Sequence, residues 1–588
     1  MTNKAAISEP TPYEKLVTSA FIEPIRSVTI IDDAYPTWES WLNGSAIVQD
    51  GIIRLKNGAG ENETSAMQIS GIIERFRTMS PALNVDIHDG QKTDGVSSYF
   101  HQSDLVVLDY ELSADAPKER HSLQIAKTLL TQNTHFNLIV MHTSETDLEL
   151  PFNGVLRSLI PPLEWLDEEA VKRGEELADN ADDYDALTTS IGIQEFARAM
   201  RLGSAEAVRR AIKDNGSYFQ ATHQHLYEDW TDENIQDVAQ FLLSSFQQEA
   251  GDTLAGEAEP SMLSFSFAAL PWIRTSFGFI VFSNKTIHPD PLDTLRKALC
   301  KWEPTPSRLI SAKIRSALEA QGISYEDELL QNPLVGWKQY RQMISSGADT
   351  EALIRSEISR HMENFSDGMA PTVTEFGAEI ISVDSVDDDG KTSEFEKIYG
   401  LNDAKEQAAC MQYNCSVSLK PAAGSHLSTG QILCCDERKF LVLTPLCDLV
   451  PGRGASASAL KEVLVVDLTP VTGDGPVKKA LKNATSNHYV FLPDADGNVA
   501  PHHIYKGDVS NNSVPKSRLW FVRNGGVFDV IDGVRSLIAY ETHTDDDGRP
   551  KYQEKTYQLF EFQLRYEYAL HFLSKVGNKA SRVGLEFL

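Results

Sequence analysis

Three short apolar runs in the first quarter of the chain each end in polar residues, and this arrangement is what most constrains the fold. The runs 28–31, 105–108 and 138–141 lead into Asp32-Asp33, Asp109 and Thr143-Ser144. Continuous apolar runs of this length are typical of parallel strands that are covered by helices on both faces. Ligands of an open parallel sheet bind beyond the carboxyl ends of its strands, so the sequence predicts one crevice that holds three carboxylates.

Three carboxylates in one crevice repel one another, and a hard cation with oxygen ligands relieves the repulsion. The pattern therefore predicts Mg²⁺ as a cofactor, with Asp32, Asp33 and Asp109 as candidate ligands. Asp109 is also the candidate nucleophile that accepts a phosphoryl group. A hydroxyl of Thr143 or Ser144 would hydrogen-bond a phosphoryl oxygen and move on its arrival. The alternative is a parallel sheet whose strands merely end in polar residues.

On these residues, the segment from about 25 to 165 resembles the receiver domain of bacterial response regulators. The resemblance rests on Asp32-Asp33, on Asp109 within Leu-Asp-Tyr-Glu-Leu, and on Thr143, 34 positions after Asp109 (143 − 109). It implies a doubly wound, flavodoxin-like sheet of five parallel strands and a phosphorylation switch. A histidine-kinase-like or other ATPase protein is the partner that it implies.

Two features depart from the receiver pattern. Between Asp33 and Asp109 lie 75 residues (109 − 33 − 1), more than one helix, one strand and a second helix need, so an insertion is expected near 41–80. Receivers also carry a lysine directly after the fifth strand. We expect that strand, and therefore its lysine, at the apolar stretch 159–165. No lysine occurs from Ser144 until Lys172. This gap favours a second hypothesis, a degenerate receiver that acts as a scaffold without phosphorylation.

The formal net charge is −30 and is concentrated in the front of the chain. Residues 416–588 contain 20 Lys+Arg and 19 Asp+Glu, which leaves 34 and 65, or −31, for the first 415 residues. An acidic surface repels phosphate backbones, which argues against nucleic-acid binding by the N-terminal two thirds. The near-neutral tail leaves a less favoured alternative, a nucleic-acid-processing protein that acts through its C-terminal domain.

No stretch approaches the roughly 18 apolar residues of a membrane span, and the start MTNKAAISEP lacks a signal pattern. We therefore expect a cytoplasmic protein without a membrane partner. Five of the six cysteines, Cys410, Cys415, Cys434, Cys435 and Cys447, fall within 38 residues. They could supply a zinc site, but cysteines in strand-like runs more often act as small buried apolar groups.

Sequence patterns divide the chain into four parts: a receiver-like domain at 1–165, a mainly helical domain at 166–375, an acidic linker at 376–404 and a β-rich domain at 405–588. In the helical part, 193–214 predicts helix, turn, helix, which is either a plain hairpin or a DNA-reading unit; the surrounding acidity favours the hairpin. A strand is expected at 275–283. From residue 416, short strands separated by turns predict a small barrel or sandwich, followed by a terminal helix at 557–576.

These features together predict a multidomain signalling or regulatory protein in which a receiver-like domain relays its state to a partner or effector. The only enzymatic activity that they predict is phosphorylation of the protein's own aspartate. The polar landmarks of the C-terminal domain, 444–449, Arg453 and 581–584, resemble those of uncharacterised domains appended to receiver-like modules in bacterial phage-defence and conflict systems. That resemblance implies a setting in antiviral defence.

Overall fold

The computed structural model forms two compact units, residues 1–320 with 369–398 and residues 321–368 with 399–588. The structure describes residues 10–580 apart from 58–59, 80, 91–99, 101, 113–116, 133–135, 215–217, 255, 257, 259–261, 322–331, 346–349, 384–393, 400–404, 437, 450–459, 487, 495–496, 508, 510–512, 532, 545–546 and 548.

A mixed seven-stranded sheet lies at the centre of the described part of the first unit, in the order β5-β1-β6-β7-β10-β9-β8. The first five strands are parallel, and β9 and β8 add antiparallel pairs at one edge. The parallel part runs second, first, third, fourth, fifth in chain order, which confirms the doubly wound, flavodoxin-like fold. The strands are β1 (Ser27–Ile31), β5 (Asn84–His88), β6 (Leu105–Leu108), β7 (Asn137–Thr143), β8 (Ser264–Ser266), β9 (Trp272–Arg274) and β10 (Gly278–Asn284).

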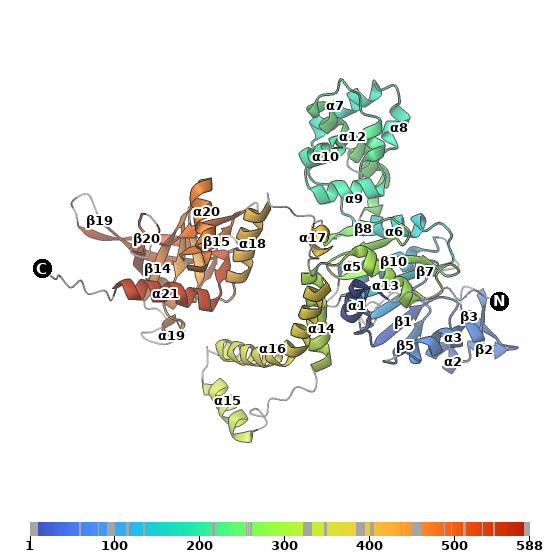
Figure 1. Ribbon diagram of the computed structural model, residues 1–588, viewed down its shortest axis with the longest axis horizontal. Helices are drawn as coiled ribbons and strands as arrows, with labels where there is room; N and C mark the ends of the chain where they lie inside the picture. The colour runs from blue at the N-terminus through green and yellow to red at the C-terminus, as the bar shows by residue number, and fades with distance from the viewer. Residues whose placement is uncertain are drawn as a thin grey trace. The chain divides into compact units, whose positions relative to one another are not determined.

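Helices cover both faces of this sheet (Figure 1). Successive residues of a strand point to opposite faces, so Ile30 packs in one core and Ile31 in the other. The core that contains Ile30 includes α1 (Pro12–Val17), α3 (Ala66–Arg77), α13 (Pro291–Trp302) and α14 (Pro306–Gln321); the core that contains Ile31 includes α5 (Arg120–Thr131) and α6 (Glu149–Leu159). Because both faces are buried, the strands read as the unbroken apolar runs seen in the sequence.

Extra elements separate β1 from α3, in the region where an insertion near 41–80 was expected. They are α2 (Trp38–Leu42) and a small antiparallel sheet of β2 (Ala46–Gln49), β3 (Ile52–Asn57) and β4 (Gly60–Ser65). Residues 66–77 do not belong to the added sheet, because they form α3, the helix that connects β1 to β5. The added sheet therefore branches off just after the Asp32-Asp33 pair.

A larger helical segment separates α6 from β10, and it accounts for the mainly helical middle of the chain. Its helices are α7 (Glu168–Asp179), α8 (Tyr184–Thr188), α9 (Ile193–Leu202), α10 (Ala205–Lys213), α11 (Gln220–Gln224) and α12 (Asp232–Ala250). The chain returns to the point where it left the sheet, since the Gly256 N–H donates to the Ile160 carbonyl (3.2 Å) and the Ala258 N–H to that of Leu159 (3.0 Å). A Cβ at Gly256 would lie 1.9 Å from the Leu159 carbonyl, so the return requires glycine.

The expectation that the fifth strand lies at 159–165 is wrong. α6 ends at Leu159, and the Leu163 N–H donates to the side chain of Gln247 on α12 (2.7 Å). The stretch is apolar because it packs between α6 and the helical segment, and Leu159, Ile160 and Leu163 are all buried there. The fifth strand is β10, and the parallel sheet thus extends past the boundary expected at residue 165.

Residues 193–213 form the predicted helix, turn, helix. Gly203 takes a left-handed conformation (φ 71°) at the end of α9, and the Ser204 hydroxyl accepts from the Ala207 N–H to begin α10. The basic side chains of α10 pair with acids: Arg209 Nη1 lies 2.7 Å from Asp232 Oδ2, Lys213 also pairs with Asp232, and Arg210 lies 3.7 Å from Glu206. This pairing supports the hairpin interpretation over DNA reading.

A closed antiparallel barrel of six strands forms the core of the second unit in its described residues, which confirms the barrel-like C-terminal fold. The ring runs β12-β13-β14-β17-β19-β20 and closes because β20 pairs with both β19 and β12. Its strands are β12 (Gln431–Cys435), β13 (Arg438–Val442), β14 (Lys461–Pro470), β17 (Ser517–Val522), β19 (Val534–Thr544) and β20 (Pro550–Leu564), joined by β11 (Leu419–Pro421), β15 (Tyr489–Pro493), β16 (Val499–His503) and β18 (Asp529–Ile531).

The terminal helix is shorter than expected. Residues 557–564 belong to β20, and α21 spans Tyr566–Ala580. Tyr557, Phe560 and Leu564 lie at helical spacing in the sequence, but in the strand they serve two different cores: Tyr557 packs inside one and Leu564 in the other. The further helices of the chain are α15 (Pro333–Ser345), α16 (Thr350–Val383), α17 (Glu394–Tyr399), α18 (Glu406–Ser418), α19 (Leu446–Leu449) and α20 (Asp474–Lys482).

Parts of the segment expected to be an acidic linker, 376–404, belong to the first unit. Phe376 and Ile380 of α16 and Phe395 of α17 are buried in the core that contains Ile30. Residues 384–393 and 400–404, which hold most of the acidic run, lie outside the described residues. Described residues within 376–398 thus contribute side chains to a folded core.

The clustered cysteines show no arrangement suited to zinc in the part of the chain that the structure describes. Cys410 and Cys415 lie on α18, whereas Cys434 and Cys435 lie on β12; the side chain of Cys447 is outside the described residues. Burial raises the pKa of the Cys415 and Cys434 thiols, which disfavours the thiolate that a metal needs. This favours their interpretation as apolar groups.

Glu541 is a buried carboxylate inside the barrel and predicts a pH-dependent stability. It accepts hydrogen bonds from Tyr557 Oη and Lys555 Nζ (3.3 Å). Burial alone would raise the pKa of Glu541, but these hydrogen bonds and charges outweigh it and lower the pKa. A carboxylate with a depressed pKa stabilises the fold above its unfolded pKa and loses this contribution as pH falls through the folded pKa.

We expect Glu541→Gln to lower the free energy of unfolding of the barrel by about 1–3 kcal/mol at neutral pH. The variant should also lose much of the decrease in barrel stability that the parent shows as the pH falls. Hydrogen exchange of peptides within 534–564 measures both effects at neutral and acidic pH. Glu561→Gln, at an exposed position of β20, is a matched control and should exchange like the parent protein. Equal protection of the Glu541→Gln and parent barrels at neutral pH would contradict this role of Glu541.

Candidate metal and phosphoacceptor site

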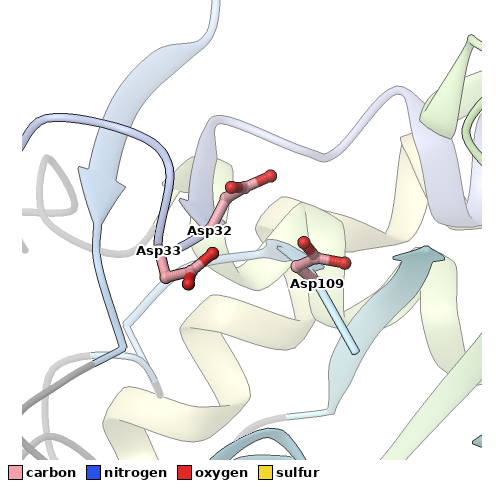
Figure 2. A group of neighbouring side chains, drawn as sticks. All are labelled: Asp32, Asp33 and Asp109. Carbon is pink, nitrogen blue, oxygen red and sulfur yellow. The ribbon is translucent and has the colours of Figure 1, made fainter. Parts of the chain in front are cut away.

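The three predicted aspartates meet at one edge of the parallel sheet. Asp32 and Asp33 follow β1, and Asp109 follows β6, which pairs with β1 so that Ile31 lies opposite Leu108. The Asp109 N–H donates to the Ile31 carbonyl (2.9 Å), which holds the two strand ends together. Each aspartate offers a carboxylate oxygen within 4.8 Å of the others, and Figure 2 shows the three side chains gathered at these strand ends. In the described residues this is the only such cluster of His, Cys, Asp or Glu.

A lysine that sequence reasoning missed completes the site. Lys285 follows β10, and its Nζ lies 2.8 Å from Asp32 Oδ2 and 2.9 Å from Asp109 Oδ2. Its backbone N–H donates to the Thr143 carbonyl (2.8 Å), because β10 pairs with β7 in parallel. The conclusion that the chain lacks a lysine after the fifth strand is therefore wrong. The lysine is displaced in sequence by the helical segment, not lost.

A signal for Lys285 was present in the sequence. The apolar run 278–282 predicts a strand, and all seven residues of β10 are buried, as a central parallel strand requires. The following Asn284 organises the turn, since its Oδ1 accepts from the N–H groups of Thr286 (2.8 Å) and Ile287 (3.1 Å). Its Nδ2 donates to the Glu145 carbonyl (2.8 Å) and ties this turn to the loop after β7.

Local hydrogen bonds fix one oxygen of each buried carboxylate. Asp32 is 5% exposed, and its Oδ1 accepts from the Ala34 N–H (3.0 Å). Asp109 Oδ1 accepts from the N–H of Tyr110 (2.8 Å). In each case the other oxygen, Oδ2, contacts Lys285. The carboxylates are thus oriented before any ligand binds.

The charged groups of the site carry a net negative charge that a bound cation would neutralise. Burial raises the pKa of Asp109 to about 6; Lys285 opposes this shift and Asp32 adds to it. Burial and Asp32 also raise the pKa of Asp33. For Lys285, burial lowers the pKa, but Asp32 and Asp109 outweigh burial and raise it, so the ammonium stays charged. Three ionised carboxylates and one ammonium carry −2, the charge that one divalent cation neutralises.

The donor set fits Mg²⁺. This ion prefers oxygen ligands and typically takes one or two carboxylates together with phosphate oxygens, and the cluster contains no nitrogen or sulfur donor. Asp32, Asp33 and Asp109 are the residues that would hold it. The two predicted hydroxyl residues lie at the end of β7, on the same edge of the sheet. Thr143 is buried, and its Oγ1 accepts a hydrogen bond from the Glu145 N–H (3.1 Å). Ser144 is exposed.

The strand order and the gathering of Asp32, Asp33 and Asp109 at one sheet edge are those expected from the resemblance to a receiver domain. Residues 24–191 match the family model described as a response receiver domain, so the chain carries a receiver domain in its N-terminal region and has a role in signalling or regulation. The matched segment ends before β10, and Lys285 is assigned to the site by the structure alone. No curated protein and no solved structure matched the chain. Within the described residues, no helix is long and apolar enough to cross a membrane.

We expect Asp33→Asn to weaken Mg²⁺ binding by roughly tenfold or more, because the change removes one charged oxygen ligand beside Asp32 and Asp109. Isothermal titration of the full chain with MgCl₂ measures this change. Asp86→Asn is a matched control on β5, since Asp86 is exposed and lies outside the cluster. Equal Mg²⁺ affinities for the Asp33→Asn variant and the parent would remove Asp33 from the site.

Proposed function

We propose that Asp109 accepts a phosphoryl group in a Mg²⁺-dependent reaction and that the chain passes this state on to a partner or effector. The observation that carries the proposal is Lys285 Nζ, which lies between Asp32 and Asp109 beside a three-carboxylate cluster. A sheet that merely ended in polar residues would have no reason to bury these charges together. Burying charges is costly unless they serve a ligand or pair well.

The proposed transfer is a displacement at phosphorus. An oxygen of Asp109 attacks the phosphorus atom, and the bond between phosphorus and the donor nitrogen or oxygen breaks. The leaving group keeps the electron pair of that bond: an imidazole nitrogen then takes a proton from solvent, whereas the carboxylate released from acetyl phosphate needs none. Lys285 stabilises the negative charge of the phosphoryl oxygens, and Asp32 holds the ammonium in place. Mg²⁺ supplies the charge neutralisation that lets a dianion approach three carboxylates.

The proposed relay begins at Thr143. Its carbonyl accepts from Lys285, and its hydroxyl accepts from Glu145 at the start of the loop that leads into α6. α6 then leads directly into the helical segment at Leu159–Ile160. A phosphoryl group that drew the Thr143 hydroxyl toward itself would therefore disturb the loop before α6, as in other switches driven by one hydrogen bond.

A histidine-kinase-like or related ATPase protein is the proposed donor of the phosphoryl group, and a bacterial defence system is the proposed setting. The match to a receiver domain supports a kinase-like donor. The β-rich C-terminal domain, which follows the receiver domain in the chain, supports the defence setting. Lys285 removes the reason for which a degenerate, unphosphorylated scaffold was favoured. We therefore propose the active switch over the scaffold.

Binding of beryllofluoride, a mimic of the phosphoryl group, tests the proposal on the full chain. We expect ¹⁹F NMR to show a bound species when beryllium, fluoride and MgCl₂ are present together, and to lose it when EDTA removes the metal. The scaffold alternative predicts no bound species under either condition. A bound signal that survives EDTA would mean that the site does not use a divalent cation.

A further inference from the structure

An apolar cavity of about 310 Å³ lies beside the small sheet inserted after Asp33. It is bordered by α2 and by β2 and β3 of the small sheet. Helix α3 and strand β5 of the main sheet complete its wall. Aromatic and aliphatic side chains dominate its wall, among them Trp38, Trp41, Val48, Ile69 and Ile73. Its size falls at the lower end of the range for small-molecule sites, roughly 300–1,000 Å³.

The wall exposes large apolar groups that a closed core would cover. Trp38 is 64% exposed and Val48 is 51% exposed, although both line the cavity. Leaving two such side chains partly in water forgoes some of the stabilisation that burial of apolar surface provides. Two indole rings and a wall of aliphatic side chains suit a flat apolar molecule, because aromatic rings favour stacked or edge contacts.

Arg77 is the cationic side chain among the described residues that line this cavity. Ser70 and Arg77 are the polar residues of its wall, and both lie on the exposed side of α3. No carboxylate of the described residues pairs with Arg77, whereas Arg75, two positions earlier, pairs with Asp290. Among the residues that the structure describes, the wall includes no acidic side chain. A guanidinium that no described carboxylate pairs with, next to an apolar wall, is complementary to a carboxylate, which it can bind through two parallel hydrogen bonds.

We propose that this cavity binds a small, flat, apolar molecule that carries one carboxylate, with the ring system between Trp41 and Ile73 and the carboxylate on Arg77. The site is separate from the aspartate cluster, and its occupancy does not depend on phosphorylation. It nevertheless lies close in sequence to that cluster: Pro36 borders the cavity, and the preceding Tyr35 N–H donates to the Asp32 carbonyl (3.0 Å).

The test uses 2-naphthoate as the probe and 2-naphthamide as its uncharged twin, each titrated into the full chain without Mg²⁺. We expect saturable binding of 2-naphthoate at one site, and binding of 2-naphthamide that is weaker by roughly tenfold or more, the usual gain from a charge-assisted pair. Ser70→Trp, which fills the cavity from an exposed helix position, should weaken both probes by roughly tenfold or more. Arg77→Gln should lower the affinity for 2-naphthoate to that for 2-naphthamide and leave the amide unchanged.

Arg120→Gln is the matched control, because Arg120 is an exposed arginine on α5, outside the cavity. It should bind both probes as the parent does. The proposal is overturned if the parent binds neither probe, if it binds acid and amide equally, or if Ser70→Trp leaves binding intact. A dimer in sedimentation that Ser70→Trp dissociates would also overturn it, since a second copy would then cover this face.

Discussion

Replacing Asp109 with asparagine abolishes phosphoryl uptake from acetyl phosphate in our account, with a loss of at least about a hundredfold. The amide keeps the size of the side chain but loses the nucleophilic carboxylate oxygen. It also removes the buried charge whose pKa is raised to about 6 by burial, so we expect the variant to stay folded. Intact-mass spectrometry of the full chain, incubated with acetyl phosphate and MgCl₂, measures the fraction that carries one phosphoryl group.

Asp86→Asn is the matched control for this experiment, because Asp86 is an exposed aspartate on the neighbouring strand β5. It should gain the phosphoryl group at the rate of the parent protein. Uptake by the Asp109→Asn variant at the parental rate would place the phosphoryl group on another residue. In that case the aspartate cluster would have a different role.

Replacing Lys285 with methionine separates metal binding from phosphoryl transfer. Methionine fills a similar volume without charge, so Asp32 and Asp109 lose the cation that lies 2.8 Å and 2.9 Å from their Oδ2 atoms. The site then becomes more negative, and we expect Mg²⁺ to bind as tightly as in the parent or tighter. Phosphoryl transfer loses the ammonium that stabilises the phosphoryl oxygens, and its rate should fall by roughly a hundredfold.

Two readouts on the same variant are needed, isothermal titration with MgCl₂ and the rate of mass gain from acetyl phosphate. Lys301→Met on the exposed end of α13 is the control, and it should change neither. A parallel loss of Mg²⁺ affinity and transfer rate would mean that Lys285 only supports the fold of the site. An unchanged transfer rate would show that the lysine has no part in the reaction.

The strands that form the core of the site could be predicted because their signal is local. In β1, β6 and β7, burial on both faces demands an unbroken apolar run, and the polar residues just after each run mark its carboxyl end. Asp32, Asp33 and Asp109 follow from those ends. The receiver-like character of the N-terminal region follows from their order along the chain, and residues 24–191 match the family model of a response receiver domain.

Lys285 could not be assigned to the site in the same way, because its position depends on long-range pairing. The helical segment places β10 far from β7 in sequence, and the parallel pairing of β10 with β7 becomes apparent only in the structure. A similar limit applies to β20. Its apolar residues fit helical spacing and strand alternation equally well, and barrel closure against β19 and β12 decides between them.

The most direct test of the central claim is to trap the modified residue chemically. After incubation with acetyl phosphate and MgCl₂, borohydride reduces an aspartyl phosphate to homoserine, and peptide mass spectrometry then identifies the position. The account predicts homoserine at position 109, dependent on Mg²⁺ and absent when EDTA is present. Homoserine at another position, or none at all in protein that binds Mg²⁺ normally, would contradict the claim that this cluster is a phosphoacceptor site.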